Sequence, residues 1–202
     1  MTGAGTRGRG CYHALVAANP RRVAATYADL EALPPHLVGE LIGGVLHAHA
    51  RPRLRHAGAA SSLGDELGPP FNRGRGGPGG WILLDEPELH LASDVLVPDL
   101  AGWKRARLPE LPDEPYLSLA PDWVCEVLSP STAALDRTDK LGVYARDRVP
   151  HVWLLDPDVK LLEVLELDGE TYRFAGAHRG DARVRAVPFD AIELDLPLLW
   201  SR

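Results

Sequence analysis

The sequence predicts a mixed domain of the α/β or α+β class, in which a central mixed β-sheet is flanked by a few helices. Apolar, strand-like runs recur along the chain, at 37–50, 81–91, 94–103, 122–128, 151–157 and 160–167. Segments with helical spacing of apolar residues separate some of them, at 53–67 and 132–146. The 202 residues, 45% of them hydrophobic, suit one domain with a sizeable core.

The N-terminal segment of the chain differs in composition from the rest. Residues 1–22 are rich in glycine and arginine and are predicted to be a disordered tail, whereas residues 23–202 are predicted to form a single domain. The N-terminus has no apolar signal-peptide core, and no run approaches the length of a membrane span. Two cysteines, Cys11 and Cys125, do not make a disulfide framework. We therefore expect a cytoplasmic protein with no membrane contact.

The first elements have recognisable local signals. Thr26 followed by Asp29 matches a helix N-cap with an acid three residues later. Residues 37–50 alternate around Gly43 and Gly44, which predicts two strands joined by a tight hairpin turn.

A helix is predicted over 53–67, and one face of it carries apolar or small residues, namely Leu54, Ala57, Ala60 or Ser61, and Leu67. The glycine-rich stretch 68–80 is predicted to be a loop. It follows a helix and precedes a strand, which is the reverse of a dinucleotide-binding fingerprint, so we exclude that function.

The middle of the chain predicts further strands. Residues 81–91 form two strand pieces around a turn, and 94–103 reads as one continuous strand. Residues 104–121 are charged and rich in proline, which is typical of a loop. The strand 122–128 should end at Ser129-Pro130, and the helix 132–146 follows, with Leu141, Tyr144 and Ala145 anchoring it to the sheet. The remaining chain predicts a buried strand and a meander turning at Asp168-Gly169.

Three carboxylates interrupt apolar strands, which is unusual because acids are depleted there. Strand alternation places Glu126 on one face with Val124 and Leu128, so it needs a base, hydrogen-bond donors or a metal as partner. Asp99 and Glu40 have similar apolar neighbours. Taken singly, Glu126 could pair with a core arginine, Asp99 could cap a turn, and Glu40 could lie exposed on an edge.

Taken together, the three acids indicate a shared site. If their strands converge, the carboxylates form an oxygen-rich cage, and Mg²⁺ or Mn²⁺ prefers such ligands. The sequence therefore predicts a divalent-metal site made by Glu40, Asp99 and Glu126.

Three segments also resemble a known family. They are "ELIGGVL" at 40–46, "VLVPDLAGW" at 95–103, and "PDWVCEVLSPSTAALDRTDKLGVYARDRVPHVWLLDP" at 121–157. They resemble the Uma2 family, a group of restriction-endonuclease-like proteins that is similar to the PD-(D/E)xK nuclease superfamily. The resemblance implies a restriction-endonuclease-like mixed β-sheet core flanked by helices, and phosphodiester hydrolysis with a divalent metal.

Carried over to this chain, the resemblance makes Asp99 the motif aspartate and Glu126 the (D/E) residue, with Glu40 as the additional acid. The superfamily pattern places lysine two residues after this glutamate, but this chain has Leu128. Lys140, four residues after Asp136 on the next helix, is the candidate replacement. An ordinary surface ion pair between Lys140 and Asp136 is the alternative.

The function expected is a metal-dependent nuclease. Asp99, Glu126 and the Val127 carbonyl would hold Mg²⁺ or Mn²⁺, Glu40 would be a further ligand or would orient water, and Lys140 would take part in catalysis. The partner would be nucleic acid, with DNA favoured, and a homodimer is plausible because a double-strand cut needs two sites. The alternative is a non-catalytic nuclease-like module that binds nucleic acid or protein, which Leu128 favours.

The net charge and the distribution of basic residues indicate how such a protein would bind nucleic acid. The formal net charge of -6 argues against binding through the overall field of the molecule. Three local basic clusters exist, namely Arg51, Arg53 and Arg55 with His56; Arg73 with Arg75; and Lys104, Arg105 and Arg107. For any single cluster, a solvated surface is the simpler interpretation.

Overall fold

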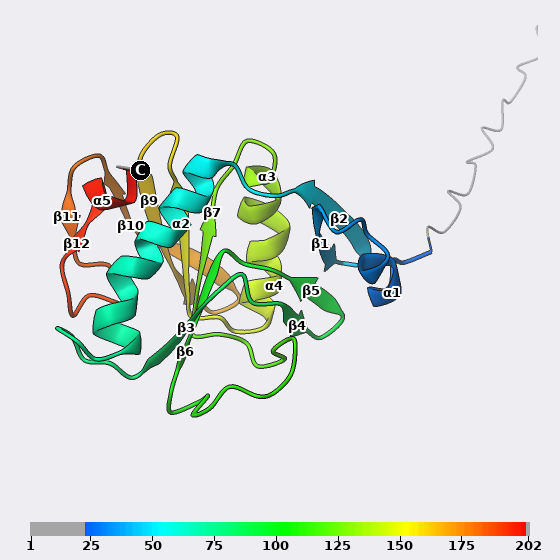
Figure 1. The fold of residues 1–202 in the computed structure, drawn as a ribbon, viewed down its shortest axis with the longest axis horizontal. Helices are drawn as coiled ribbons and strands as arrows, with labels where there is room; N and C mark the ends of the chain where they lie inside the picture. The colour runs from blue at the N-terminus through cyan, green and yellow to red at the C-terminus, as the bar shows by residue number, and fades with distance from the viewer. Residues whose placement is uncertain (1–22, 201–202) are drawn as a thin grey trace, which may run out of the picture.

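The computed structural model describes residues 23–200. The predicted disordered tail, residues 1–22, lies outside the described residues. A six-stranded mixed sheet forms the centre, with strand order β10-β9-β8-β7-β6-β3 (Figure 1). Its strands are β3 (Trp81–Asp85), β6 (Leu100–Lys104), β7 (Trp123–Val127), β8 (His151–Asp156), β9 (Leu161–Asp168) and β10 (Thr171–Arg179). Helices and a mixed sheet confirm the predicted fold class.

A smaller sheet lies beside the main one, with strand order β2-β1-β5-β4. Its strands are β1 (Leu37–Ile42), β2 (Val45–Ala50), β4 (Leu89–Leu91) and β5 (Asp94–Leu96). The hairpin of β1 and β2 turns at Gly43 and Gly44, whose φ angles of 59° and 74° suit glycine, so the predicted hairpin is confirmed. It lies with α1 (Tyr27–Glu31) at one end of the molecule (Figure 1). The Thr26 and Asp29 capping box of α1 is also present.

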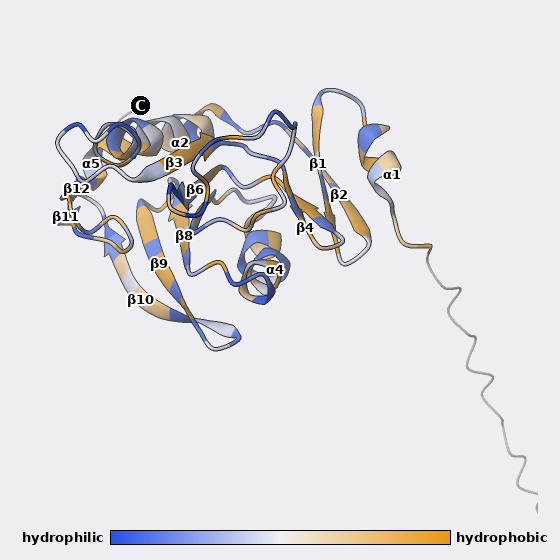
Figure 2. Cartoon of the chain, turned by 90° about the horizontal axis from the view of Figure 1, so that it is seen from below, coloured by the Kyte–Doolittle hydropathy of each residue, from blue (hydrophilic) through white to orange (hydrophobic). Residues whose placement is uncertain are grey.

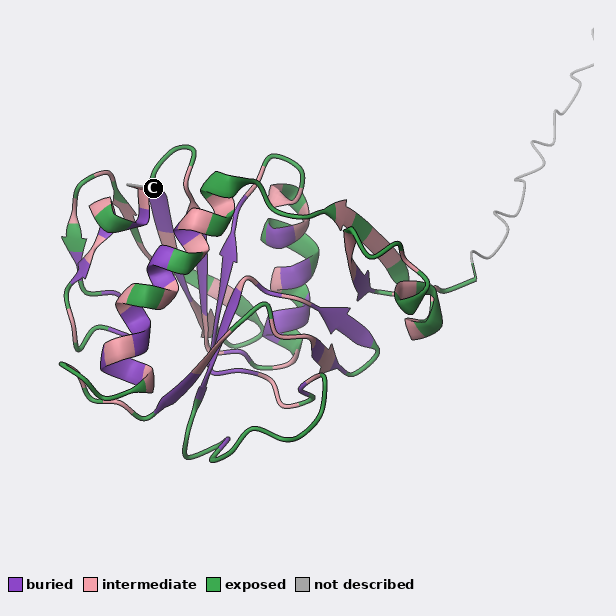
Figure 3. Ribbon diagram, viewed as in Figure 1, coloured by how far each residue is buried: buried purple, intermediate pink, exposed green. Residues whose placement is uncertain are grey.

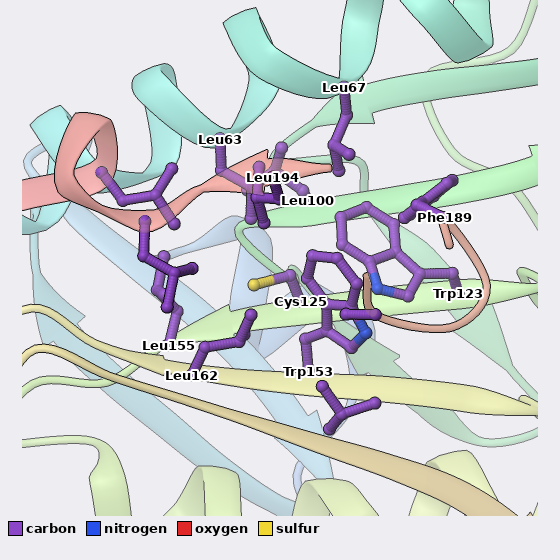
Figure 4. Packing of buried hydrophobic residues seen from close by; sticks show 14 of the residues in the cluster. Leu63, Leu67, Leu100, Trp123, Cys125, Trp153, Leu155, Leu162, Phe189 and Leu194 are labelled. Atoms are coloured by element: carbon purple, nitrogen blue, oxygen red, sulfur yellow. The ribbon is translucent and has the colours of Figure 1, made fainter. Parts of the chain in front are cut away.

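Two apolar cores cover the two faces of the main sheet. On one face α2 (Leu54–Leu67) packs with the C-terminal elements β11 (Arg183–Val184), β12 (Leu194–Asp195) and α5 (Leu196–Trp200). Figure 4 shows Leu63 and Leu67 of α2 above Trp123, Cys125 and Trp153 of the sheet. The strands β6 and β7 are buried throughout most of their length (Figure 3).

The other face is covered by a helical segment that joins β7 to β8. It consists of α3 (Ala133–Leu135), a π-helical turn η2 (Asp136–Lys140) and α4 (Leu141–Arg146). Because β7 and β8 run parallel, the chain needs such a crossover between them. The strand ends before Ser129-Pro130, and Tyr144 and Ala145 are buried on the sheet, as the sequence predicts. In Figure 2, β9 is largely hydrophobic, whereas the edge strand β10 is mixed.

The prediction of one strand over 94–103 is wrong. The chain leaves β5 of the small sheet at Leu96 and enters β6 of the main sheet at Leu100. Pro98 explains the break, since it has no N–H to continue a strand ladder. Asp99 therefore lies at the crossing between the two sheets, and not inside a strand.

The predicted apolar face of α2 is confirmed at Leu67 and in part at Ala60, but it is wrong at Leu54. The buried residues Ala59, Leu63 and Leu67 are spaced by four, whereas Leu54 is 91% exposed. At 100° per residue, Leu54 lies about 140° around the helix from Ala59. The predicted loop 68–80 begins instead as a π-helical turn η1 (Gly68–Asn72). Among residues 23–200, no helix combines the length and apolar character needed to cross a bilayer.

Candidate functional site

Glu126 lies in the middle of β7 and is 1% exposed. Val124 and Leu128 belong to the core on the same face of the sheet, which confirms the predicted strand faces. Two side chains from the crossover helix partner the carboxylate. The Tyr144 hydroxyl donates to Oε1 at 2.5 Å, and the Lys140 ammonium donates to Oε2 at 3.2 Å. The predicted need for a partner is thus confirmed, and no core arginine fills it.

Lys140 joins three carboxylates at one buried point. Its Nζ lies 2.9 Å from Glu40 Oε1, 3.2 Å from Glu126 Oε2 and 3.2 Å from Asp136 Oδ1. The residue is 4% exposed and Asp136 is 2% exposed, so the surface-pair interpretation is wrong. Both residues lie in the π-helical turn η2, a feature that recurs at functional sites.

Glu40 reaches this point from β1 of the small sheet and is fully buried, so an exposed edge position is excluded. Its Oε1 also accepts the backbone N–H of Val97 at 2.9 Å, and its Oε2 lies 3.4 Å from His49 Nε2. Both oxygens are therefore engaged by this chain. A metal-ligand role for Glu40 stays a prediction, and its contacts are those of a residue that holds Lys140 in place.

Asp99 lies directly before β6, next to the strand that carries Glu126. The β6–β7 register pairs Leu100 with Cys125, so Asp99 comes one residue before the first paired position of β6. Asp99 Oδ2 accepts the backbone N–H of Val127 at 2.7 Å, and Oδ1 lies 3.3 Å from His56 Nε2. The four predicted side chains, from two sheets and one helix, therefore gather at one place.

Burial dominates the electrostatics of these acids. Burial raises the pKa of Glu126 well above its ordinary range, and the charges of Asp136, Asp99 and Glu40 raise it further against the opposing effect of Lys140. Burial likewise raises the pKa of Asp99 to about 7. For Glu40, burial alone would raise the pKa, but Lys140, His49 and the Val97 N–H together lower it.

Lys140 stays charged in this environment. Burial disfavours its ammonium form, yet the carboxylates of Glu126, Glu40 and Asp136 raise its pKa well above the ordinary value. One cation thus faces four acids once Asp99 is included. The excess of negative charge at Asp99 and Glu126 would be offset by a divalent cation.

The oxygen donors at this site suit a hard cation that takes only a few ligands from the protein. Within residues 23–200, no three carboxylate, imidazole or thiol side chains are grouped so as to hold a metal ion. The cation shared by Glu40 and Glu126 is the Lys140 ammonium. Asp99, Glu126 and Val127 still line one cavity. Mg²⁺ is commonly bound by one or two carboxylates with several waters, so this oxygen-donor set suits it.

The site opens into a cavity of about 690 Å³, within the size range of ligand pockets. Its walls include β2 with His49, the start of α2 with His56, and the turn 129–132 after β7. Because Asp99, Glu126 and Lys140 all line this space, a ligand in it would reach the buried charges.

The substitution Asp99→Asn should stabilise the metal-free protein, and more so at high pH. The pKa of about 7 exceeds the ordinary aspartate value of 3.8, so between these pH values the folded chain keeps a proton that the unfolded chain has released. The ionised carboxylate therefore destabilises the fold, and the free energy of unfolding falls as pH rises from about 4 to about 7. Thermal melts in EDTA should show a larger gain in Tm for the variant at pH 8 than at pH 5. An equal gain at both pH values would contradict the account.

Three partners of the acids are not singled out as such by the sequence. His49 and His56 belong to β2 and α2, and only the folded arrangement brings them to Glu40 and Asp99. The buried Nδ1 of His56 has no hydrogen-bond partner among the described residues. Tyr144 is predicted as an apolar anchor of its helix, but its hydroxyl also serves Glu126. Its position four residues after Lys140 is the one signal that could have indicated this.

Comparison with known proteins gives a family and a fold. The family model Uma2, described as "Putative restriction endonuclease", matches residues 24–197. No curated protein matches the chain. Among solved structures, the chain is similar to that of "a putative nuclease belonging to DUF820" from Anabaena variabilis, with a TM-score of 0.66 and 23% identity. The similarity covers 87% of this chain and 97% of that one, and at this identity it shows the fold.

Proposed function

Since the chain belongs to the Uma2 family, we propose that it is a divalent-metal-dependent nuclease that hydrolyses phosphodiester bonds of nucleic acid, with DNA as the substrate. One observation carries the proposal. Asp99 and Glu126 line one cavity together with Lys140, whose buried ammonium lies 3.2 Å from Glu126 Oε2. Paired carboxylates with an adjacent fixed cation suit phosphoryl chemistry, in which positioning and charge stabilisation do most of the work.

The residues that would hold Mg²⁺ or Mn²⁺ are Asp99, Glu126 and the carbonyl of Val127. When bound there, the cation would stabilise charge on the phosphate and lower the pKa of water. The chain itself fixes this geometry. The Val127 N–H holds Asp99 at 2.7 Å, and the Tyr144 hydroxyl holds Glu126 at 2.5 Å.

Lys140 supplies the fixed positive charge that the motif pattern would otherwise take from position 128. Leu128 packs into the core and is 3% exposed, so it offers nothing to a phosphate. The Lys140 ammonium, oriented by Glu40 and Asp136, would stabilise negative charge that develops on the phosphate. Because it is held before substrate binds, little reorganisation is needed during the reaction.

A cleavage assay tests the proposal. Single-stranded and duplex DNA, and RNA of the same sequence, are incubated with the full chain in Mg²⁺, in Mn²⁺ and in EDTA. We expect cleavage of DNA in at least one of the two metals and none in EDTA. Binding without cleavage under every condition would contradict catalysis and would favour the non-catalytic binding module.

A further inference from the structure

We propose that Arg51 and Arg53 hold the phosphate backbone of the nucleic acid at the mouth of this cavity, and that the site engages the backbone without reading bases. The inference rests on the proposed function, because it assigns the manner in which the substrate of that same site is held. Both arginines line the cavity that contains Asp99 and Glu126.

The local sequence keeps both arginines in an extended segment that borders the cavity. Pro52 fixes its own φ and biases Arg51 toward an extended conformation. Arg53 has φ −71° and ψ 159°, which is also extended. Residues 48–53 all line the cavity, Pro52 included, so the segment as a whole lies along it. The helix α2 begins at Leu54, and Arg55 no longer lines the cavity.

Arg51 and Arg53 have no partner in the part of the chain that the structure describes. Neither guanidinium has an ion pair or hydrogen bond there, although acids lie within the same cavity. Arg55, only two residues further on, instead lies 3.9 Å from Asp158 and does not line the cavity. Two exposed, unpaired cations thus share a cavity with buried carboxylates. This arrangement suits an anionic ligand that contacts the arginines and extends to the carboxylates.

Other phosphate-binding groups complete the rim. The turn after β7 carries a cluster of hydroxyls in which Ser129 Oγ lies 3.0 Å from both Ser131 Oγ and Thr132 Oγ1. These three residues line the same cavity. The 14-residue helix α2 starts beside it and has no side-chain cap at Arg53, so first-turn N–H groups remain available. Arginines, hydroxyls and helix N-termini are the groups that contact phosphates in nucleic-acid complexes.

The amide and aromatic groups that read or stack bases are missing from the described lining, apart from two histidines. None of the residues that line the cavity is tryptophan, tyrosine, phenylalanine, asparagine or glutamine. Stacking of single-stranded bases uses aromatic rings, and adenine is read by asparagine or glutamine. The whole sequence has no glutamine and two asparagines, and one of these, Asn72, accepts a hydrogen bond from Arg105. Without amides to read adenine and without large aromatic rings to stack bases, the two arginines are assigned to the phosphate backbone, and the measurement of base dependence below tests this assignment.

Binding of a fluorescent oligonucleotide, followed by anisotropy across about 50–200 mM salt, tests the inference. All variants carry Glu126→Gln so that the probe stays intact. Adding Arg51→Gln and Arg53→Gln should weaken binding at least tenfold and lower the slope of log K against log salt by about 1.4–1.8, since each lost phosphate contact removes about 0.7–0.9. Adding Arg55→Gln and Arg73→Gln changes net charge equally, and should alter binding less than twofold.

Base dependence is measured with probes of equal length and different sequence, as DNA and as RNA. Affinities within about threefold across DNA sequences support backbone recognition, and a preference above tenfold for one sequence overturns it. In the catalytically intact chain, the Arg51 and Arg53 substitutions should raise KM and leave kcat unchanged. Cleavage with unchanged KM overturns this inference alone, whereas a wild-type chain that neither binds nor cuts nucleic acid overturns the proposed function.

Discussion

Replacing Lys140 by methionine should abolish most activity and destabilise the fold at the same time. The variant would leave Glu40, Glu126 and Asp136 buried without their shared cation. Removing one partner of a buried ion pair typically costs about 3–5 kcal/mol. The loss of a fixed charge near the reacting phosphate should lower the cleavage rate by about 10²–10³. Chemical denaturation and single-turnover cleavage measure the two effects separately.

The pH dependence identifies the cause of the instability. Without Lys140, the pKa of each of the three buried carboxyls should rise, and those of Glu126 and Asp136 already lie above their ordinary values. Stability is then greatest at low pH and is lost as pH rises through the folded-state pKa values. The double variant Lys140→Met with Glu40→Gln removes one of these charges and should recover part of the stability without recovering cleavage. A Lys140→Met chain as stable and as active as wild type at pH 8 would contradict the account.

Replacing Glu126 by glutamine should separate function from stability. The change removes a carboxyl group whose pKa is raised well above its ordinary range by burial. Because the charged form of this group is unfavourable in the core, the metal-free fold should be as stable as wild type or more stable. The amide can still form one hydrogen bond to Tyr144 and another to Lys140. Mn²⁺ affinity measured by calorimetry should fall at least a hundredfold, and cleavage should fall by about 10³ or more.

Glu88 provides the matched control for this substitution. It accepts hydrogen bonds from Tyr27 and His90 and does not line the cavity around Asp99. Glu88→Gln therefore changes the net charge equally and should leave Mn²⁺ binding and cleavage intact. If Glu126→Gln kept wild-type affinity for Mn²⁺, the proposed placement of the metal would be wrong.

The alternation of side chains along a strand accounts for most of what was predicted correctly about the site. It places Glu126 on the face of Val124 and Leu128, and the structure finds it there because β7 is regular and central. The prediction failed at Pro98, since alternation over 94–103 assumes one sheet and the chain changes sheets. Periodicity describes a strand and its two faces, but it does not specify which sheet the next strand joins.

The environment of Lys140 could not be predicted from spacing alone. An acid and a lysine four residues apart are typical of an exposed helix surface. Here a π-helical turn, η2, contains both residues, and both are buried among groups from the main and small sheets. The contributions of His49 and Glu40 arise from the packing of the β1–β2 hairpin against the main sheet. Such long-range contacts leave no local pattern in the sequence.

Anomalous diffraction from crystals of the protein soaked in Mn²⁺ tests where the metal binds. We expect one strong anomalous peak within coordinating distance of a carboxylate oxygen of Asp99, one of Glu126 and the carbonyl of Val127. The Lys140 ammonium should remain between Glu40 and Asp136, where it lies 2.9 Å and 3.2 Å from their oxygens. A cavity without a peak at saturating Mn²⁺, or a peak that involves neither Asp99 nor Glu126, would contradict this placement of the metal.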